Sequence, residues 1–167
     1  MGIILASFRG CGKTYLTNSY RDKVKVYDAT EYDHEISDDD RVDDILNHTV
    51  DTDIVFTGID DQTLDALDSR GVDYDVFYPA KERRGEFIEN QVIKRSNPKI
   101  IQELDRYFEK WVDGIDERES SNCYKHKLNN NGEFISNSPI INTYINSLKD
   151  NSTVETNDNK SENNVEE

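Results

Sequence analysis

A glycine-rich stretch near the start of the chain, SFRGCGKT at residues 7–14, carries the residue types of a phosphate-binding loop. The pattern of such loops is G-x-x-x-x-G-K-[ST], placed between a strand and a helix. Gly12, Lys13 and Thr14 match its last three positions, whereas Ser7 stands where the first glycine is usual. Serine is small enough to let the chain turn, so the substitution weakens the match without breaking it.

Each residue type in this loop has a chemical role to play toward a nucleotide. Gly10 and Gly12 let the backbone bend so that successive N–H groups point at phosphate oxygens, and the following helix adds its positive end. Lys13 is expected to reach the β- and γ-phosphates, and the Thr14 hydroxyl to ligate Mg²⁺. The predicted cofactors are therefore ATP and Mg²⁺, and the predicted ATP-binding residues are Arg9, Gly10, Cys11, Gly12, Lys13, Thr14 and Tyr15.

An acidic residue, Asp28, ends a second predicted strand and adds a carboxylate to the same edge of the sheet. Ligands of open parallel sheets bind at the carboxyl ends of the strands. Asp28 is therefore predicted to position an acceptor or to hold Mg²⁺, and the alternative is that it caps the next segment. Glu31 and Asp33 are weaker candidates because the whole stretch that follows is acidic.

Basic residues gather after the fourth predicted strand, at Lys81, Arg83, Arg84, Lys94 and Arg95. Guanidinium forks suit phosphate oxygens, and Arg84 and Arg95 are predicted to close over the transferred phosphoryl group. If residues 86–95 form a helix, these two arginines lie about three turns apart on a similar face. The alternative is a solvated basic face that balances an acidic protein.

The elements that must position these residues alternate between strand and helix. Apolar runs predict strands at 2–7, 24–28, 53–57 and 74–78, and helical spacing predicts helices at 13–20, within 31–50, and at 63–71, 86–95, 98–115 and 138–148. Residues 123–136 are predicted to form a hairpin around NNNG. This order indicates an α/β domain over residues 1–148 with a parallel sheet of four or five strands, followed by a disordered acidic tail at 149–167.

Composition limits the partners and the compartment. The chain has 167 residues and a net charge of −15, which disfavours nucleic acid unless basic residues are grouped. No apolar run reaches the length of a membrane span and no signal peptide is evident, so a cytoplasmic protein without a membrane partner is expected. Cys11 and Cys123 are predicted to be free thiols, and Cys11 to act as a small apolar filler rather than a redox switch.

Longer stretches of the chain resemble a group of small P-loop proteins encoded by bacteriophages, described as ATP-binding or nucleotide-kinase-like. The resemblance spans roughly residues 2–148 and is carried by SFRGCGKTYL, VKVYDATEYD and the region from Asp73 to Asp116. Within that region the matching features are Tyr78-Pro79, Arg84, Lys94-Arg95 and Trp111. It implies a nucleoside-monophosphate-kinase-like fold and a viral origin, with the host cytoplasm as the compartment. Ser7 and the short basic lid depart from the larger nucleotide kinases.

These observations predict an ATP-dependent phosphotransferase that acts on a nucleotide, with a (deoxy)nucleoside monophosphate as the expected acceptor. Lys13, Asp28, Arg84 and Arg95 are the predicted catalytic residues, and Thr14 and Asp28 the predicted metal ligands. No NKxD motif of a GTPase switch is present, and the third strand ends without a clean Walker B acid. Two alternatives stay open: a kinase of nucleic-acid ends or modified bases, and a non-catalytic protein that binds a nucleotide or a host protein.

Overall fold

The computed structural model describes residues 1–30 and 36–158. Glu31 and Asp33, the weaker acidic candidates, lie outside the described residues. The elements in chain order are β1 (Ile3–Ser7), α1 (Lys13–Ser19), β2 (Val26–Ala29), α2 (Asp38–His48), β3 (Ile54–Thr57), α3 (Asp61–Ser69), β4 (Tyr74–Pro79), η1 (Lys81–Arg83), α4 (Arg84–Ile93), α5 (Pro98–Asp116), β5 (Cys123–Leu128), η2 (Ile135–Asn137) and α6 (Pro139–Asp158).

Five parallel strands form one sheet in the order β2-β3-β1-β4-β5, which confirms the predicted α/β architecture. β1 occupies the centre, with Leu5 opposite Phe56 of β3 on one side and opposite Asp75 of β4 on the other. β1 and β3 are mostly apolar along their length, as expected where helices cover both faces of a parallel sheet. All four residues of β3 are buried, as expected for such a strand.

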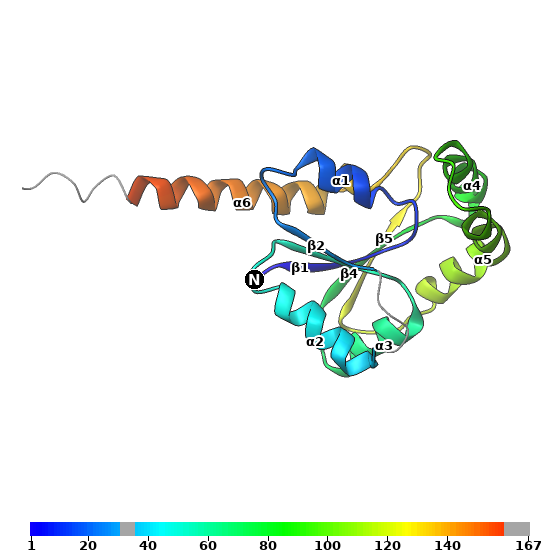
Figure 1. Cartoon of the computed structure of the whole chain (residues 1–167), viewed down its shortest axis with the longest axis horizontal. Coiled ribbons are helices and arrows are strands. Elements are labelled where there is room, and N and C mark those ends of the chain that lie inside the picture. Colours follow the sequence, from blue (N-terminus) through cyan, green and yellow to red (C-terminus); the bar gives the residue numbers. More distant parts are fainter. Residues whose placement is uncertain (31–35, 159–167) are drawn as a thin grey trace, which may run out of the picture.

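Helices lie on both faces of this sheet (Figure 1). α1 and the first turns of α6 lie on one face, and α2 and α3 lie on the other. α4 and α5 lie near the end of β1 that leads into α1. The start of α6 is anchored by the buried Ile141 and Ile145 and by the Tyr144 hydroxyl, which donates to the Asp53 carbonyl at 2.8 Å. Within the described ranges, no helix combines the length and apolar character needed to cross a membrane.

The predicted hairpin at residues 123–136 is wrong. Residues 123–128 form a single strand, β5, which pairs in parallel with β4 over its whole length. The NNNG stretch does turn, since Gly132 has a φ of 75°, but the chain then crosses to the carboxyl end of β1. There Ile135 is fully buried, so burial of an apolar side chain in the shared core replaces the local pairing of a hairpin.

Two helix ends that bear on the predicted lid and tail differ from the prediction. α4 ends at Ile93, so Lys94 and Arg95 lie beyond its last turn. α6 continues to Asp158, past the predicted end at Leu148, and residues 159–167 of the predicted tail lie outside the described part of the chain. Helix boundaries depend on capping and packing contacts, which a hydrophobic period alone does not reveal.

An aromatic cluster joins α4 and α5 to the end of β1. The Phe8 ring packs edge-to-face on three other rings. The distances between ring centroids are 5.2 Å to Phe108, 6.1 Å to Phe87 and 6.1 Å to Trp111. Phe8, Phe87 and Phe108 are buried, and Trp111 packs against them from the rim of the core. The cluster therefore fixes where α4 lies relative to the residues that follow β1.

Replacing Phe108 with alanine should destabilise the protein by about 3–5 kcal/mol, because it opens a cavity between α5 and β1. Urea unfolding followed by circular dichroism measures this loss. Phe108→Leu is the control, since a smaller change of shape should cost less than about 1.5 kcal/mol. Equal stability of Phe108→Ala and the wild type would contradict this account of the cluster.

Candidate functional site

The glycine-rich loop, residues 8–12, turns the chain from the end of β1 into α1. Gly10 and Gly12 have φ values of 90° and 96°, a backbone region that residues other than glycine rarely adopt. Gly12 is also the N-cap of α1, and a Cβ there would lie 3.0 Å from the Cβ of Phe134. Glycine is therefore required at Gly12 both by the backbone conformation and by the space available.

Contacts with β4 hold this loop in place. The Phe8 N–H donates to the Phe77 carbonyl at 3.0 Å, and the Cys11 thiol approaches the same carbonyl at 3.6 Å. Cys11 is fully buried, and burial raises the pKa of its thiol while the nearby Arg83 charge offsets only part of that effect. A buried, protonated thiol packs as a small apolar side chain, which confirms the predicted filler role. Cys11 and Cys123 are both free.

Lys13 and Asp28, which are far apart in sequence, meet at the carboxyl edge of the sheet. The Lys13 ammonium lies 2.7 Å from Asp28 Oδ2 and donates to Thr30 Oγ1 at 3.0 Å. Thr30 in turn donates to Asp28 Oδ1 from its hydroxyl at 2.6 Å and from its backbone N–H at 3.0 Å. Sequence analysis did not identify Thr30, although its place two residues after an aspartate is typical of a local Asx turn.

This network sets the protonation state of Asp28. Burial acts to raise the pKa of the Asp28 carboxyl, but the hydrogen bonds from Lys13 and Thr30 outweigh it, and the pKa lies below its ordinary value. Asp28 is therefore ionised at neutral pH and faces a positive charge. About half of its side chain remains exposed, so the carboxylate is accessible to a ligand from solvent.

The remaining loop residues present polar groups to solvent. Arg9 in the loop and Thr14 and Tyr15 in the first turn of α1 are exposed. Carboxylate and hydroxyl oxygens are hard donors of the kind Mg²⁺ prefers, and Mg²⁺ in such sites takes one or two carboxylates together with substrate phosphates. Asp28 and Thr14 fit that donor set. The described residues contain no cluster of three or more His, Cys, Asp or Glu side chains that would hold a metal without a substrate.

A buried hydroxyl also lies at this edge of the sheet. Thr57 ends β3, paired with Ala6 of β1 and Ala29 of β2, and is completely buried. Within the described part of the chain its Oγ1 has no hydrogen-bond partner. An unpaired buried hydroxyl costs about 1–3 kcal/mol, and such groups recur next to functional sites or bound water.

The predicted pair of catalytic arginines does not converge. Arg84, at the start of α4, forms an ion pair with Asp105 of α5 and donates to the Asp105 carbonyl at 3.0 Å. Arg95 lies beyond the other end of α4, is exposed, and has a φ of 53°. The prediction that both lie on one helical face is therefore wrong, because the helix ends before Arg95. A catalytic role for either arginine stays a prediction.

The rest of the basic cluster is dispersed too. Lys81 pairs with Asp113 at 2.9 Å, and Arg83 is buried against Glu86 at 2.7 Å. Lys94 is exposed just beyond α4. The five basic residues therefore do not form one phosphate-binding surface, since carboxylates of the protein neutralise Lys81, Arg83 and Arg84.

The segment after β5 is part of the site, and sequence analysis missed it. The Ile135 N–H donates to the Cys11 carbonyl at 2.9 Å, and Phe134 packs beside Gly12. The segment thus lines the glycine-rich loop at Cys11 and Gly12. The only signal in the sequence is an apolar pair, Phe134 and Ile135, directly after a polar turn.

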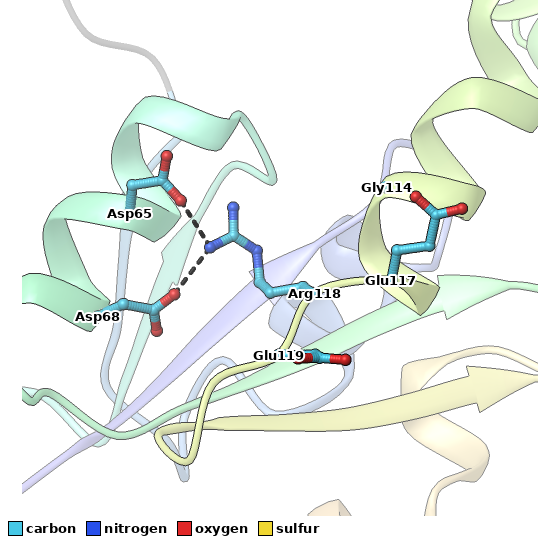
Figure 2. A pocket seen from close by; sticks show the side chains of 6 residues that line it. All are labelled: Asp65, Asp68, Gly114, Glu117, Arg118 and Glu119. Carbon is cyan, nitrogen blue, oxygen red and sulfur yellow. Dashed lines mark hydrogen bonds and ion pairs between the residues drawn. The ribbon is translucent and has the colours of Figure 1, made fainter.

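One surface hollow lies elsewhere. It measures about 340 Å³ and is lined by Asp65, Asp68, Gly114, Glu117, Arg118 and Glu119 (Figure 2). Arg118 reaches toward α3, where it meets Asp65 at 2.8 Å and Asp68 at 2.7 Å, while Glu117 and Glu119 point away from it. The hollow is formed by the ends of α3 and α5, which lead into the amino ends of β4 and β5. It therefore lies at the edge of the sheet opposite the glycine-rich loop and is separate from the candidate site.

Comparison with models of known protein families finds no match for this chain, and comparison with curated proteins finds none. The function is therefore inferred from the chain's own residues and their geometry.

The Lys13–Asp28 pair predicts a specific dependence of stability on pH. The folded-state pKa of Asp28 is lowered, so its stabilising contribution is present above its unfolded pKa of about 3.9 and is lost as pH falls through the folded value. Between pH 5 and pH 3 the wild type should therefore lose more unfolding free energy than Asp28→Asn. Urea unfolding at several pH values measures both slopes. Asp51→Asn controls for removal of one charge, and identical slopes for wild type and Asp28→Asn would contradict the pairing.

Proposed function

We propose that this chain is a P-loop protein of nucleoside-monophosphate-kinase-like fold that transfers the γ-phosphoryl group of ATP to a nucleotide. The expected acceptor is a (deoxy)nucleoside monophosphate. One observation carries the proposal, which is the ion pair between Lys13 and the ionised Asp28 at the carboxyl ends of the parallel strands. Lys13 lies in the first turn of α1, directly after a loop with two glycines of positive φ.

The order of the strands supports this placement of the ligand. After β1 the chain forms β2 and β3 on one side of β1. It then crosses to the other side of β1, where it forms β4 and β5. Ligands of open α/β sheets bind where the strand order reverses in this way, outside the carboxyl ends of the strands. The glycine-rich loop starts at that point, because it follows β1 directly.

The residues of the site suit phosphoryl transfer, which depends on positioning and on neutralising charge. Lys13 would exchange its contact with Asp28 for contacts with the β- and γ-phosphate oxygens. The N–H groups of the loop and of the first turn of α1 would bind the same phosphates. Thr14 and Asp28 would hold Mg²⁺, which neutralises phosphate charge when bound. Asp28 is also placed to accept a hydrogen bond from the acceptor.

A non-catalytic nucleotide-binding protein is the second candidate, and one observation favours it. Arg84 is paired with Asp105, and Arg95 lies beyond the far end of α4, so the described structure does not assemble two arginines over the loop. Such a protein would bind nucleotide through Lys13 and the loop without rapid transfer. A kinase of nucleic-acid ends is less compatible with a net charge of −15.

The first experiment is an assay of the purified chain with Mg-ATP and each common ribo- and deoxynucleoside monophosphate, with chromatographic detection of diphosphates. We expect one acceptor or a small set to turn over. Lys13→Ala should lower kcat/KM about 10²–10³-fold, because the lysine charge faces the transferring group. Lys23→Ala, at an exposed lysine outside the loop, is the control.

The outcomes separate the two candidates. Turnover that survives Lys13→Ala would remove the loop from the mechanism. Calorimetric binding of ATP without turnover of any acceptor would favour the non-catalytic protein, and absence of both would refute nucleotide binding.

Asp28→Asn should separate the two roles of that carboxylate. If Asp28 holds the metal, the Mg²⁺ concentration that gives half-maximal ATP binding should rise about tenfold, because a neutral amide is a poorer ligand. If it positions the acceptor instead, the acceptor KM should rise while the Mg²⁺ requirement is unchanged. Titration of Mg²⁺ at fixed ATP, followed by calorimetry, measures the first effect without any turnover. Unaltered Mg²⁺ and acceptor dependence would exclude both roles.

A further inference from the structure

Arg83 is the largest side chain that the structure buries almost completely, with 1% of its surface exposed. It follows β4 and precedes α4, and it donates to both Glu86 oxygens, from Nε at 2.7 Å and from Nη2 at 3.0 Å. A bidentate pair of this kind compensates the cost of burying a guanidinium only when its remaining donors are also satisfied.

The remaining donors of Arg83 bind the segment that follows β5. Its Nη1 donates to the Leu128 carbonyl at 3.1 Å and to the Glu133 carbonyl at 2.8 Å. Glu86 reaches the same segment, since its Oε1 accepts from the Gly132 N–H at 2.8 Å. The ion pair therefore fixes both ends of residues 128–133, which contain few apolar side chains of their own to hold them in place.

Two aromatic side chains that flank Arg83 also contact the glycine-rich loop. The guanidinium lies 5.0 Å from the Phe87 ring centroid and 5.6 Å from that of Phe134. Phe134 packs at Gly12, and Phe87 lies 3.2 Å from the position of a Cβ on Gly10. One arginine thus contacts both the ring that packs at Gly10 and the ring that packs at Gly12.

We infer that the Arg83–Glu86 pair is a positioning element that holds α4 and residues 128–135 against the glycine-rich loop and so presets the loop backbone for phosphate. The effect on a nucleotide rests on the proposed function, whereas the effect on the loop does not. A loop already held in its binding conformation loses less entropy when the ligand binds, so its affinity is higher. The donors of Arg83 bind Glu86 and two backbone carbonyls, so Arg83 would act on the loop through Phe87, Phe134 and the Ile135–Cys11 hydrogen bond.

Arg118 provides a matched control. Its side chain is 10% exposed and forms ion pairs with Asp65 and Asp68, so its replacement also removes a largely buried guanidinium. It lies at the opposite edge of the sheet, beside the hollow of Figure 2. A general loss of stability should therefore follow from changing either arginine, but loosening of the loop should follow only from changing Arg83.

The test compares Arg83→Lys and Arg118→Lys in the full chain. Lysine keeps the charge but cannot reproduce the planar fork, so the contacts with Glu86 and the two carbonyls cannot all form. We expect Arg83→Lys to speed amide hydrogen exchange of residues 10–14 and 129–135 about tenfold and to weaken Mg-ADP binding about tenfold, by calorimetry below the unfolding transition. Arg118→Lys should leave both within about twofold of the wild type.

Two results would overturn the inference. One is a folded Arg83→Lys protein whose loop exchange equals that of the wild type. The other is an Arg118→Lys protein with the same local loosening. If Arg83→Lys does not fold, Glu86→Gln provides the same readouts, since it keeps Arg83 and removes only the carboxylate charge.

Failure of the proposed function looks different. If wild-type protein binds no Mg-ADP while Arg83→Lys still speeds hydrogen exchange of residues 10–14, the role of Arg83 in positioning the loop is supported and nucleotide binding is refuted. If Mg-ADP binds equally well to wild type and to a loosened Arg83→Lys protein, presetting for phosphate is refuted although nucleotide binding stands.

Discussion

The central position of β1 is the constraint on which the rest of the structure depends. β3 and β4 pair with β1 on its two sides, so the position and the direction of the carboxyl end of β1 are fixed by the sheet. The chain must then turn over the edge of the sheet within a few residues to begin α1. Two glycines with positive φ make that turn, and they leave the loop N–H groups and the start of the helix at the same point.

Charge at this point is balanced within the protein. Lys13 meets Asp28 and Thr30, so the lysine is held in one place without a ligand and its charge is not left uncompensated. In the proposed function, an exchange of Asp28 for phosphate at Lys13 would conserve the pairing of the ammonium and so keep the cost of the rearrangement low. It would also leave the Asp28 carboxylate without its cation, a state that a divalent metal ion would compensate.

The acidic composition of the chain explains how its few basic residues are used. There are 20 Lys and Arg residues against 35 Asp and Glu residues, so a basic side chain has a carboxylate within reach nearly everywhere. Arg83 joins the start of α4 to the segment after β5, beside the glycine-rich loop, and Arg118 joins the end of α5 to α3 at the opposite end of the strands. A cluster of basic residues in this sequence is therefore poor evidence for a phosphate-binding surface, because internal ion pairs compete for the same side chains.

Local sequence patterns determined the parts of this protein that depend on short-range physics. Apolar runs placed the four strands β1 to β4, helical spacing placed the main helices, and SFRGCGKT placed a left-handed turn before α1, since glycine conformation and side-chain periodicity act over a few residues. Only the tertiary structure decided that β5 pairs with β4 instead of folding back, that Arg83 is buried while Arg84 turns to Asp105, and that Phe134 packs at Gly12. In each case groups that are distant in sequence compete as partners for a strand edge, a guanidinium or an apolar side chain. Tertiary packing decides which partner is bound, and a local sequence pattern carries no information about it.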